Sequence, residues 1–306
     1  MPAAVRADRP RHHRRRTFAL SLAASSVALL TLAAGASADL LTPESGGSSN
    51  ADDIDTLYKL TLYVALVIFV GVEGALVYCL VKFRARKGQV AAQIRGNTRL
   101  EIGWTLGAAV VLVILAVVTF VQLDDIRNPP NSDPDGFAVP AAATVQFASS
   151  EQRLPPDGNS LNIQVNGQQY VWRYTYPDDD ENVLNNAFAY TEMVVPTKTT
   201  VTLQINAQDV AHSWWIPALG GKFDALPGHT NYTWFKIDEP GSYTGQCAEL
   251  CGRGHANMVA SVRALPPEEF ERWLASKQQE ITRANELAQE QRQEIEGEQA
   301  QGDEAP

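Results

Sequence analysis

Two long apolar segments limit what this chain can fold into. Residues 60–81 and 102–122 each have about the ~20 residues that a helix needs to cross a bilayer. The loop between them carries six Lys or Arg residues, whereas the first segment has one acid, Glu73, and the second has no charged residue. Two buried helices of a soluble protein are the alternative, which the length of the segments and their contrast with the basic loop disfavour. The sequence therefore predicts a membrane hairpin over residues 39–125.

The charges around this hairpin predict its orientation. A basic loop between two spans tends to stay on the cytoplasmic side, so both ends of the hairpin should lie outside. Residues 1–38 agree, because they have an arginine-rich start, an apolar core and an Ala-Ser-Ala cleavage site at residues 36–38, as a secretory signal does. An uncleaved anchor is the alternative. We expect a multi-pass protein of a bacterial cytoplasmic membrane whose remaining domain lies on the external face.

Two acids lie at positions where the membrane makes charge unusual. Glu73 falls inside the first span, and because no second acid accompanies it there, we favour packing or hydrogen bonding against a partner helix over a functional site. Glu101 opens the second span, where the helix dipole stabilises an acid.

The sequence of the external part predicts a β domain followed by a helical tail. After a linker at 126–142 that is rich in Pro, Asn and Asp, short alternating runs separated by turn residues predict a β-sandwich or barrel over residues 143–265. The predicted strands are residues 144–148, 161–176, 188–195, 199–205, 232–237 and 258–262.

Residues 266–306 form an acidic tail. Pro267 and the acids after it predict a helix start. Apolar residues become scarce beyond about Gln279, so we expect a solvated helix there that frays into disorder and ends in GDEAP. No C-x-x-C-H sequence occurs, which excludes a haem attached covalently in that way.

One loop concentrates metal-binding chemistry. Cys247, Cys251, His255 and Met258 form the pattern C-x-x-x-C-x-x-x-H-x-x-M, and His212 offers a further imidazole. Thiolate, imidazole and thioether suit copper better than magnesium or calcium. Two thiolates shared between two copper ions would use all of these groups. The alternative is a structural disulfide between the two cysteines, with an unrelated His and Met.

The same residues carry a resemblance to a known family. The segment DVAHSWWIPALGGKFDALPG at 209–228, followed by GQCAELCGRGHANM at 245–258, resembles subunit II of the haem–copper cytochrome c oxidases, over about residues 39–273. It implies a two-helix hairpin, an all-β cupredoxin-like Greek-key domain with a binuclear CuA centre, and a C-terminal helical tail. The ligands that it implies are His212, Cys247, the backbone carbonyl of Glu249, Cys251, His255 and Met258. The Glu249 side chain is then free to reach a magnesium site shared with subunit I.

The resemblance also gives roles to residues outside that loop. QYVWRYTY at 169–176 matches the stretch that receives electrons, although the family usually has Trp where this chain has Tyr170. We expect Trp172 and Tyr174 to be core residues and leave open whether Tyr170 or Trp172 accepts the electron. Glu101 matches a position near a proton path into subunit I, which stands beside its helix-start interpretation.

Two further features concern contacts with partner proteins. An acidic run comes just after the aromatic stretch at 169–176 and consists of Asp178, Asp179, Asp180 and Glu181. Asp209 could join it. Such a run is a solvated turn or a patch that steers a basic partner. His229 replaces the usual arginine of the family and is expected at an interface or surface, not as a ligand.

The implied function is electron transfer in respiration. The chain would take electrons from a c-type cytochrome and pass them to haem in subunit I, where oxygen reduction and proton pumping occur. The expected partners are subunit I, other oxidase subunits, the cytochrome and membrane lipid, and no nucleic acid. The alternatives are a metal-free subunit of a quinol oxidase, a module of a nitric oxide or nitrous oxide reductase, and a membrane-anchored protein that delivers copper.

Overall fold

The computed structural model of the protein describes residues 42–85, 88, 90, 92–140, 152–178 and 185–303. The predicted signal at 1–38 and the predicted strand at 144–148 lie outside the described residues, as do three members of the acidic run, Asp179, Asp180 and Glu181.

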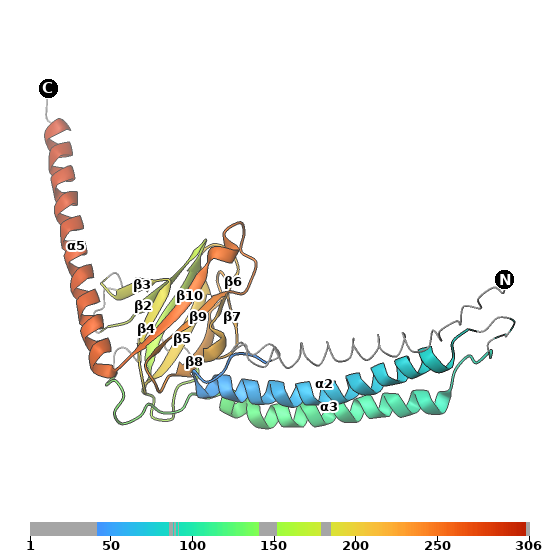
Figure 1. The fold of residues 1–306 in the computed structure, drawn as a ribbon. Helices are drawn as coiled ribbons and strands as arrows, with labels where there is room; N and C mark the ends of the chain where they lie inside the picture. The colour runs from blue at the N-terminus through green and yellow to red at the C-terminus, as the bar shows by residue number, and fades with distance from the viewer. Residues whose placement is uncertain are drawn as a thin grey trace, which may run out of the picture. The chain divides into compact units, whose positions relative to one another are not determined.

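Two helices form the predicted hairpin. Helices α2 (Ser49–Lys82) and α3 (Thr98–Arg127) lie side by side and extend beyond both predicted apolar segments (Figure 1). Both are long and apolar enough to cross a membrane, by length and composition. Helix α3 begins with a reciprocal cap. The Asn97 side chain accepts a hydrogen bond from the Leu100 N–H at 3.2 Å, and Glu101 Oε1 accepts one from the Asn97 N–H at 3.1 Å.

The described strands form two five-stranded sheets. The first has the order β3-β2-β1-β5-β8 and the second the order β4-β10-β9-β6-β7. Strands β1 and β5 pair in parallel, as do β4 and β10, and the other pairs are antiparallel. The strands of the first sheet are β1 (Leu161–Gln168), β2 (Val171–Tyr176), β3 (Ala187–Tyr190), β5 (Thr200–Ala207) and β8 (Asn231–Lys236). Those of the second are β4 (Glu192–Pro196), β6 (His212–Trp215), β7 (Phe223–Ala225), β9 (Gly241–Cys247) and β10 (Val259–Leu265).

Aromatic side chains fill the space between the sheets. Strand β2 alternates so that Trp172, Tyr174 and Tyr176 point inward and are buried, which confirms the core assignment of the first two. The Trp214 indole N–H on the other sheet donates to the Tyr174 hydroxyl at 3.2 Å. Burial raises the pKa of Tyr174, so this phenol stays neutral at physiological pH. The fold-class prediction of a hairpin, a β domain and a C-terminal helix is confirmed.

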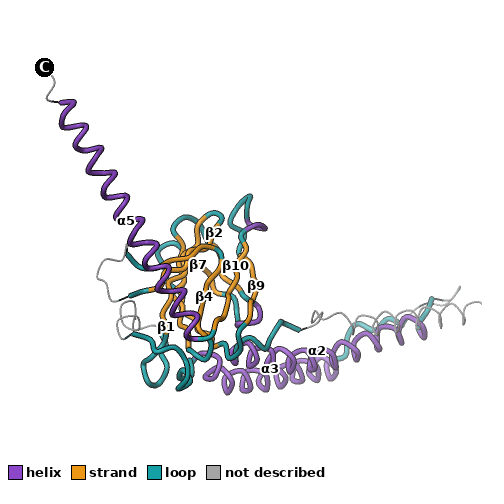
Figure 2. The backbone as a smooth tube through the Cα atoms, turned by 60° about the vertical axis from the view of Figure 1, so that its left-hand side comes forward, coloured by secondary structure: helices purple, strands orange, loops and turns teal. Residues whose placement is uncertain are grey.

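Helix α5 (Pro267–Asp303) starts against the β domain (Figure 2). Phe270 is fully buried there and meets Phe137 edge-on, with ring centroids 5.0 Å apart. Trp273 packs on Tyr176 at 5.1 Å. The helix continues beyond Gln279 to Asp303, because that stretch is built mostly from Ala, Glu, Gln and Arg, which are strong helix formers.

The predicted linker lies along the β domain. The Asp133 N–H donates to the Lys198 carbonyl at 2.8 Å, and the Thr200 hydroxyl donates to the Pro130 carbonyl at 2.7 Å. Phe137 also packs against the core. These contacts hold the segment on the start of β5.

Trp234 on β8 forms hydrogen bonds with both membrane helices. Its indole N–H donates to the Ile126 carbonyl at the end of α3, at 3.1 Å. Its own carbonyl accepts a hydrogen bond from the Asn50 side-chain amide at the start of α2, also at 3.1 Å. Two polar contacts therefore join the outer end of the hairpin to one strand.

Candidate metal centre

The metal-binding loop connects two neighbouring strands of the second sheet. Strand β9 ends at Cys247 and β10 begins at Val259, and the Cys247 N–H donates to the Met258 carbonyl at 2.9 Å. Strand β6 lies on the other side of β9, with Trp214 opposite Cys247. This pairing places His212, which starts β6, beside the loop despite 35 residues of separation from Cys247.

Six donor atoms converge in this loop and on β6. Cys247 Sγ lies 3.9 Å from His212 Nδ1 and 3.3 Å from the Glu249 carbonyl oxygen. Cys251 Sγ lies 3.7 Å from His255 Nδ1 and 3.9 Å from Met258 Sδ. The residues that supply these atoms are His212, Cys247, Glu249, Cys251, His255 and Met258, the set that the resemblance implies.

The two cysteines are free thiols in this structure. Their sulfurs are 3.9 Å apart, whereas a disulfide bond is about 2.05 Å long. Metal–thiolate bonds of about 2.3 Å would let both sulfurs share an ion at this separation. The donor atoms of His212, Cys247 and Cys251 all lie within 4.8 Å of one another. The donor set fits a soft metal ion.

Burial sets the protonation of the Cys251 thiol when no metal is bound. Burial and then the neighbouring Cys247 raise the pKa of Cys251 to about 11. Cys251 is therefore a neutral thiol at neutral pH, and a metal ion must displace its proton in order to bind. His212 and Met258 are also almost completely buried, so the site excludes bulk water on that side.

Two glycines let the loop pass close to the β1–β2 turn. Gly252 has φ +121°, a backbone conformation that L-residues rarely adopt. A Cβ on Gly254 would lie 2.4 Å from the Tyr170 ring, so only glycine fits under it. Tyr170 therefore packs on the metal-binding loop and remains 39% exposed.

A second layer of residues orients the ligands. Asp209 Oδ1 bonds to His212 Nε2 at 2.9 Å, which leaves Nδ1 facing Cys247. Asp209 Oδ2 accepts a hydrogen bond from the Gln169 N–H at 2.7 Å. The Gln169 side-chain amide in turn donates to the Cys251 carbonyl at 2.7 Å. This series of hydrogen bonds links His212 on β6 to Cys251 in the loop through the β1–β2 turn.

The other predicted site residues divide into two groups. Trp172 is buried against His212, with ring centroids 5.9 Å apart, and Tyr170 covers the loop, so both lie next to the candidate centre. Glu101 is in the first turn of α3, and His229 is exposed beside β8; neither belongs to the centre.

Sequence reasoning missed the roles of Asp209 and Gln169. The sequence suggests only that Asp209 could join an acidic face, and its carboxylate also bonds to His212 and to the Gln169 N–H. A signal was present, because an acid three residues before a candidate histidine ligand can orient its ring. Gln169 gave no such signal, because its contact with Cys251 spans 82 residues.

Fold and site together define a membrane-anchored cupredoxin-like protein with a candidate soft-metal centre. A family model described as the periplasmic domain of cytochrome c oxidase subunit II matches residues 161–265. A second, described as the transmembrane domain of the same subunit, matches residues 37–121. The chain belongs to the cytochrome c oxidase subunit II family, and it is a membrane protein with a domain of the periplasmic type. The predictions of the family and of an oxidase chain are thus confirmed.

Individual relatives agree. The chain is 33% identical over 237 residues to cytochrome c oxidase subunit 2 of Alkalihalophilus pseudofirmus, a match that covers 76% of this chain and 61% of that relative. It is 32% identical over 241 residues to the probable cytochrome c oxidase subunit 2 of Rickettsia bellii, covering 74% of this chain and 80% of the relative. A solved structure, the periplasmic domain of subunit II of cytochrome oxidase of Bradyrhizobium japonicum, is 33% identical and covers 39% of this chain and 94% of that one, with a TM-score of 0.36.

Proposed function

We propose that this chain is the electron-accepting subunit of a cytochrome c oxidase in a bacterial cytoplasmic membrane. It takes electrons from a c-type cytochrome on the external face and passes them to haem in subunit I, where oxygen reduction and proton pumping occur. The observation that carries the proposal is the convergence of six donor atoms on one loop and β6 in a chain of this family.

The ligand residues would hold a binuclear copper centre. Cys247, Cys251, His212 and His255 would be the main residues that hold the two ions, and the Glu249 carbonyl and Met258 would be weaker ligands. When bound, the two coppers supply a site that accepts and releases one electron at a time. The chain contributes a rigid cage, because Asp209 accepts hydrogen bonds from His212 and the Gln169 N–H, and the Gln169 amide donates to the loop at Cys251. A cage that changes little between two oxidation states favours fast electron transfer.

Electrons would reach this cage through one of two aromatic residues. Tyr170 is exposed and packs on the loop at Gly254, so a docked cytochrome can touch it directly. Trp172 is buried but lies against the ligand His212. We assign the exposed point to Tyr170 and leave Trp172 as the residue next to the centre.

Two glutamates would serve the contact with subunit I. The Glu249 side chain is free when its carbonyl faces Cys247, and we propose that it reaches a magnesium ion shared with subunit I. Glu101 lies at the start of α3, where the positive-inside rule puts the cytoplasmic side, and we propose that it also feeds a proton path.

Burial of the ligands disfavours the copper-delivery alternative. A protein that hands over copper needs exposed, exchangeable donors, whereas His212 is 0%, Cys247 3%, Cys251 4% and Met258 1% exposed. The metal-free quinol-oxidase alternative leaves this donor set without a role.

The test is copper counting and an electron paramagnetic resonance spectrum of the detergent-solubilised full chain. We expect two coppers per chain as one mixed-valence centre. Cys247→Ser and His255→Asn should abolish that spectrum, while the matched controls Cys79→Ser and His229→Asn, which lie outside the centre, should keep it. A single-copper, blue-type spectrum, or no copper binding at all, would overturn the proposal.

A further inference from the structure

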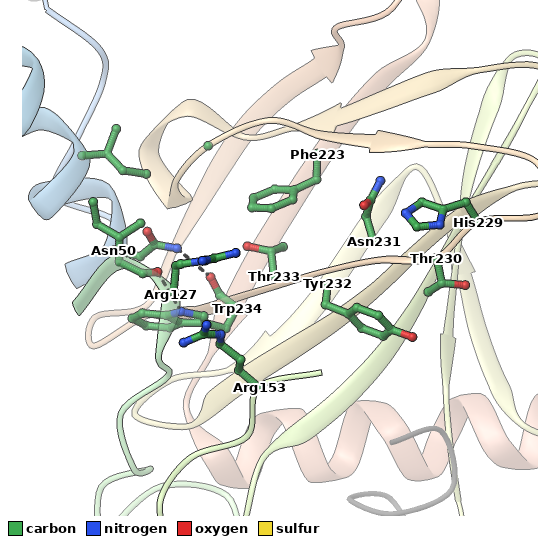
Figure 3. A pocket seen from close by; sticks show the side chains of 13 residues that line it. Asn50, Arg127, Arg153, Phe223, His229, Thr230, Asn231, Tyr232, Thr233 and Trp234 are labelled. Atoms are coloured by element: carbon green, nitrogen blue, oxygen red, sulfur yellow. Dashed lines mark hydrogen bonds between the residues drawn. The ribbon is translucent and has the colours of Figure 1, made fainter. Parts of the chain in front are cut away.

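A cleft of about 400 Å³ lies where the outer ends of the two membrane helices meet the β domain (Figure 3). We propose that it binds the headgroup of an anionic phospholipid of the outer leaflet, with Arg127 and Arg153 holding the phosphate. The cleft is separate from the metal centre. Its lining comes from α2, α3, the segment at Arg153, and β7 and β8 with the turn before β8; Asn50, Arg127, Arg153, His229 and Trp234 are among the residues labelled in Figure 3.

The charge of the lining favours an anion. Arg127 and Arg153 supply two guanidinium groups, and no Asp or Glu is among the described residues that line the cleft. Within the described residues neither arginine forms an ion pair with a carboxylate. Asp53 and Asp125 each directly precede a lining residue, but successive side chains on a helix point about 100° apart, and these two acids do not line the cleft. Guanidinium groups match phosphate geometry with paired hydrogen bonds.

The two arginines are held at the same end of the cleft. Arg127 directly follows Ile126, whose carbonyl accepts the Trp234 indole hydrogen bond. Arg153 donates a hydrogen bond to the side chain of Asn128, the residue after Arg127. In Figure 3 both arginine side chains lie near Trp234 and Asn50, while His229 and Thr230 lie at the opposite end. A phosphate between the two guanidinium groups is therefore compatible with the backbone as it stands.

The depth of Arg127 matches the phosphate layer of a bilayer. The apolar stretch of α3 ends at Gln122, and Arg127 lies five residues further on. At 1.5 Å per residue this is about 7.5 Å beyond the hydrocarbon core. The polar headgroup region adds roughly 5–7.5 Å on each side of that core. A lipid of the outer leaflet can thus offer its phosphate at the height of Arg127.

A buried amide, Asn50, forms part of the wall of the cleft. Asn50 is 3% exposed and lines the cleft, and its side-chain NH₂ donates to the Trp234 carbonyl. Its Oδ1 is buried and has no hydrogen-bond partner among the described residues. Buried acceptors of this kind are rare without a partner. Because Oδ1 is buried, a headgroup does not reach it in this structure, and the two arginines alone select for an anionic headgroup such as that of phosphatidylglycerol.

The test uses the full chain in nanodiscs of phosphatidylcholine with a minor fraction of phosphatidylglycerol. Lipids retained after transfer to detergent are counted by native mass spectrometry. We expect one retained phosphatidylglycerol per chain, and we expect retention to fall about tenfold or more in the double variant Arg127→Gln, Arg153→Gln, since charge-assisted hydrogen bonds are lost. The matched control, Arg272→Gln with Arg283→Gln on exposed parts of α5, loses the same charge and should retain the lipid. The Arg127→Lys, Arg153→Lys variant should lie between, because lysine keeps charge without the paired geometry.

Four results would overturn the proposal. The first is unchanged retention in the double glutamine variant, whose copper spectrum reports that it is folded. The second is equal retention of phosphatidylcholine, and the third is full displacement of the lipid by inorganic phosphate, which would indicate a site for a free anion. The fourth is the absence of phosphatidylglycerol from the assembled oxidase together with a cross-link from Asn231→Cys to subunit I, which would make the cleft a protein interface.

Discussion

At the scale of single residues, a variant of Met258 can show whether this residue is needed to retain the copper or only sets its reduction potential. Its sulfur lies 3.9 Å from Cys251 Sγ and is buried. Because a thioether is a weak ligand, Met258→Leu should keep the copper and shift the reduction potential. Potentiometric titration with copper counting measures both quantities. The control is Met193→Leu, a buried methionine of β4 outside the centre, which should leave the potential unchanged; loss of copper from Met258→Leu would contradict the assigned role.

Tyr170 allows a kinetic test at the same scale. The ring packs on Gly254 and remains exposed, so Tyr170→Ala should slow electron transfer within the bound complex several-fold at nearly unchanged affinity for the cytochrome. Stopped-flow reduction at saturating cytochrome measures this rate, and copper content reports whether the loop stays intact. Tyr190→Ala removes another exposed tyrosine, on β3, and should have no effect. An unchanged rate in Tyr170→Ala would move the assignment to Trp172.

At the scale of elements, one carboxylate, that of Asp209, connects the β1–β2 turn to the start of β6. Asp209 bonds to His212 and to the Gln169 N–H, so Asp209→Ala should lower copper affinity by about 10–100-fold, the usual cost of losing such a support. Asp209→Asn keeps an oxygen acceptor and should lose less. Competition with a copper chelator measures the affinity. Asp224→Ala, at the exposed position of β7, is the surface control; an equal loss there would show that general destabilisation is the cause.

The start of α3 gives a test that separates capping from proton transfer. Glu101 accepts a hydrogen bond from the Asn97 N–H, and a glutamine can do the same but cannot carry a proton. Glu101→Gln should therefore assemble normally while oxygen turnover of the complex slows and reduction of copper stays fast. Glu73→Gln, in the middle of α2, is the control and should leave turnover unchanged. Normal turnover in Glu101→Gln would leave the cap as its only role.

The elements themselves were predictable where their patterns were long. Both spans are present, and so are all the predicted strands among the described residues, at 161–176, 188–195, 199–205, 232–237 and 258–262. The segments 161–176 and 188–195 each form a pair of strands. Strands β6 and β7 have four and three residues, too few to show an alternation. Strand β9, with two glycines and mostly polar residues, lacks the β-branched signature that the prediction relied on.

The site was predictable where its residues share one loop. Cys247, Cys251, His255 and Met258 are close in sequence, so their spacing alone indicated a metal centre. The contact of Gln169 with Cys251 depends instead on how β1 and β2 turn over the loop, and the cleft at Arg127 depends on how β8 meets the hairpin. Long-range placements of this kind leave no local pattern in the chain.

At the scale of the whole molecule, the net charge and a local acidic patch should affect the association rate with a basic cytochrome differently. The chain carries a formal charge of −10. If the acidic run steers a basic cytochrome, then replacing Asp178, Asp179 and Asp180 with Asn should lower the association rate at low salt. The loss should shrink at high salt, because charges are screened over about 8 Å at physiological ionic strength.

A matched variant distinguishes steering from total charge. Replacing Glu290, Glu294 and Glu296 of α5 with Gln removes the same number of charges from exposed positions of the C-terminal helix. Association rates measured against salt should fall in the aspartate variant and stay near wild type in the α5 variant. Equal losses would mean that only net charge matters, and no loss in either would mean that the cytochrome docks elsewhere.

The hydrogen bond from the Cys247 N–H to the Met258 carbonyl closes the base of the metal-binding loop with backbone atoms alone. Every non-proline residue carries these atoms, so the closure does not depend on which side chains lie between the two ends. Residues 248–257 can in this sense be exchanged without breaking the closure, except at Gly254, which must pass under Tyr170. Variation confined to this short segment can change the donors at Glu249, Cys251 and His255 and the surface around them, while the sandwich and the hairpin stay intact.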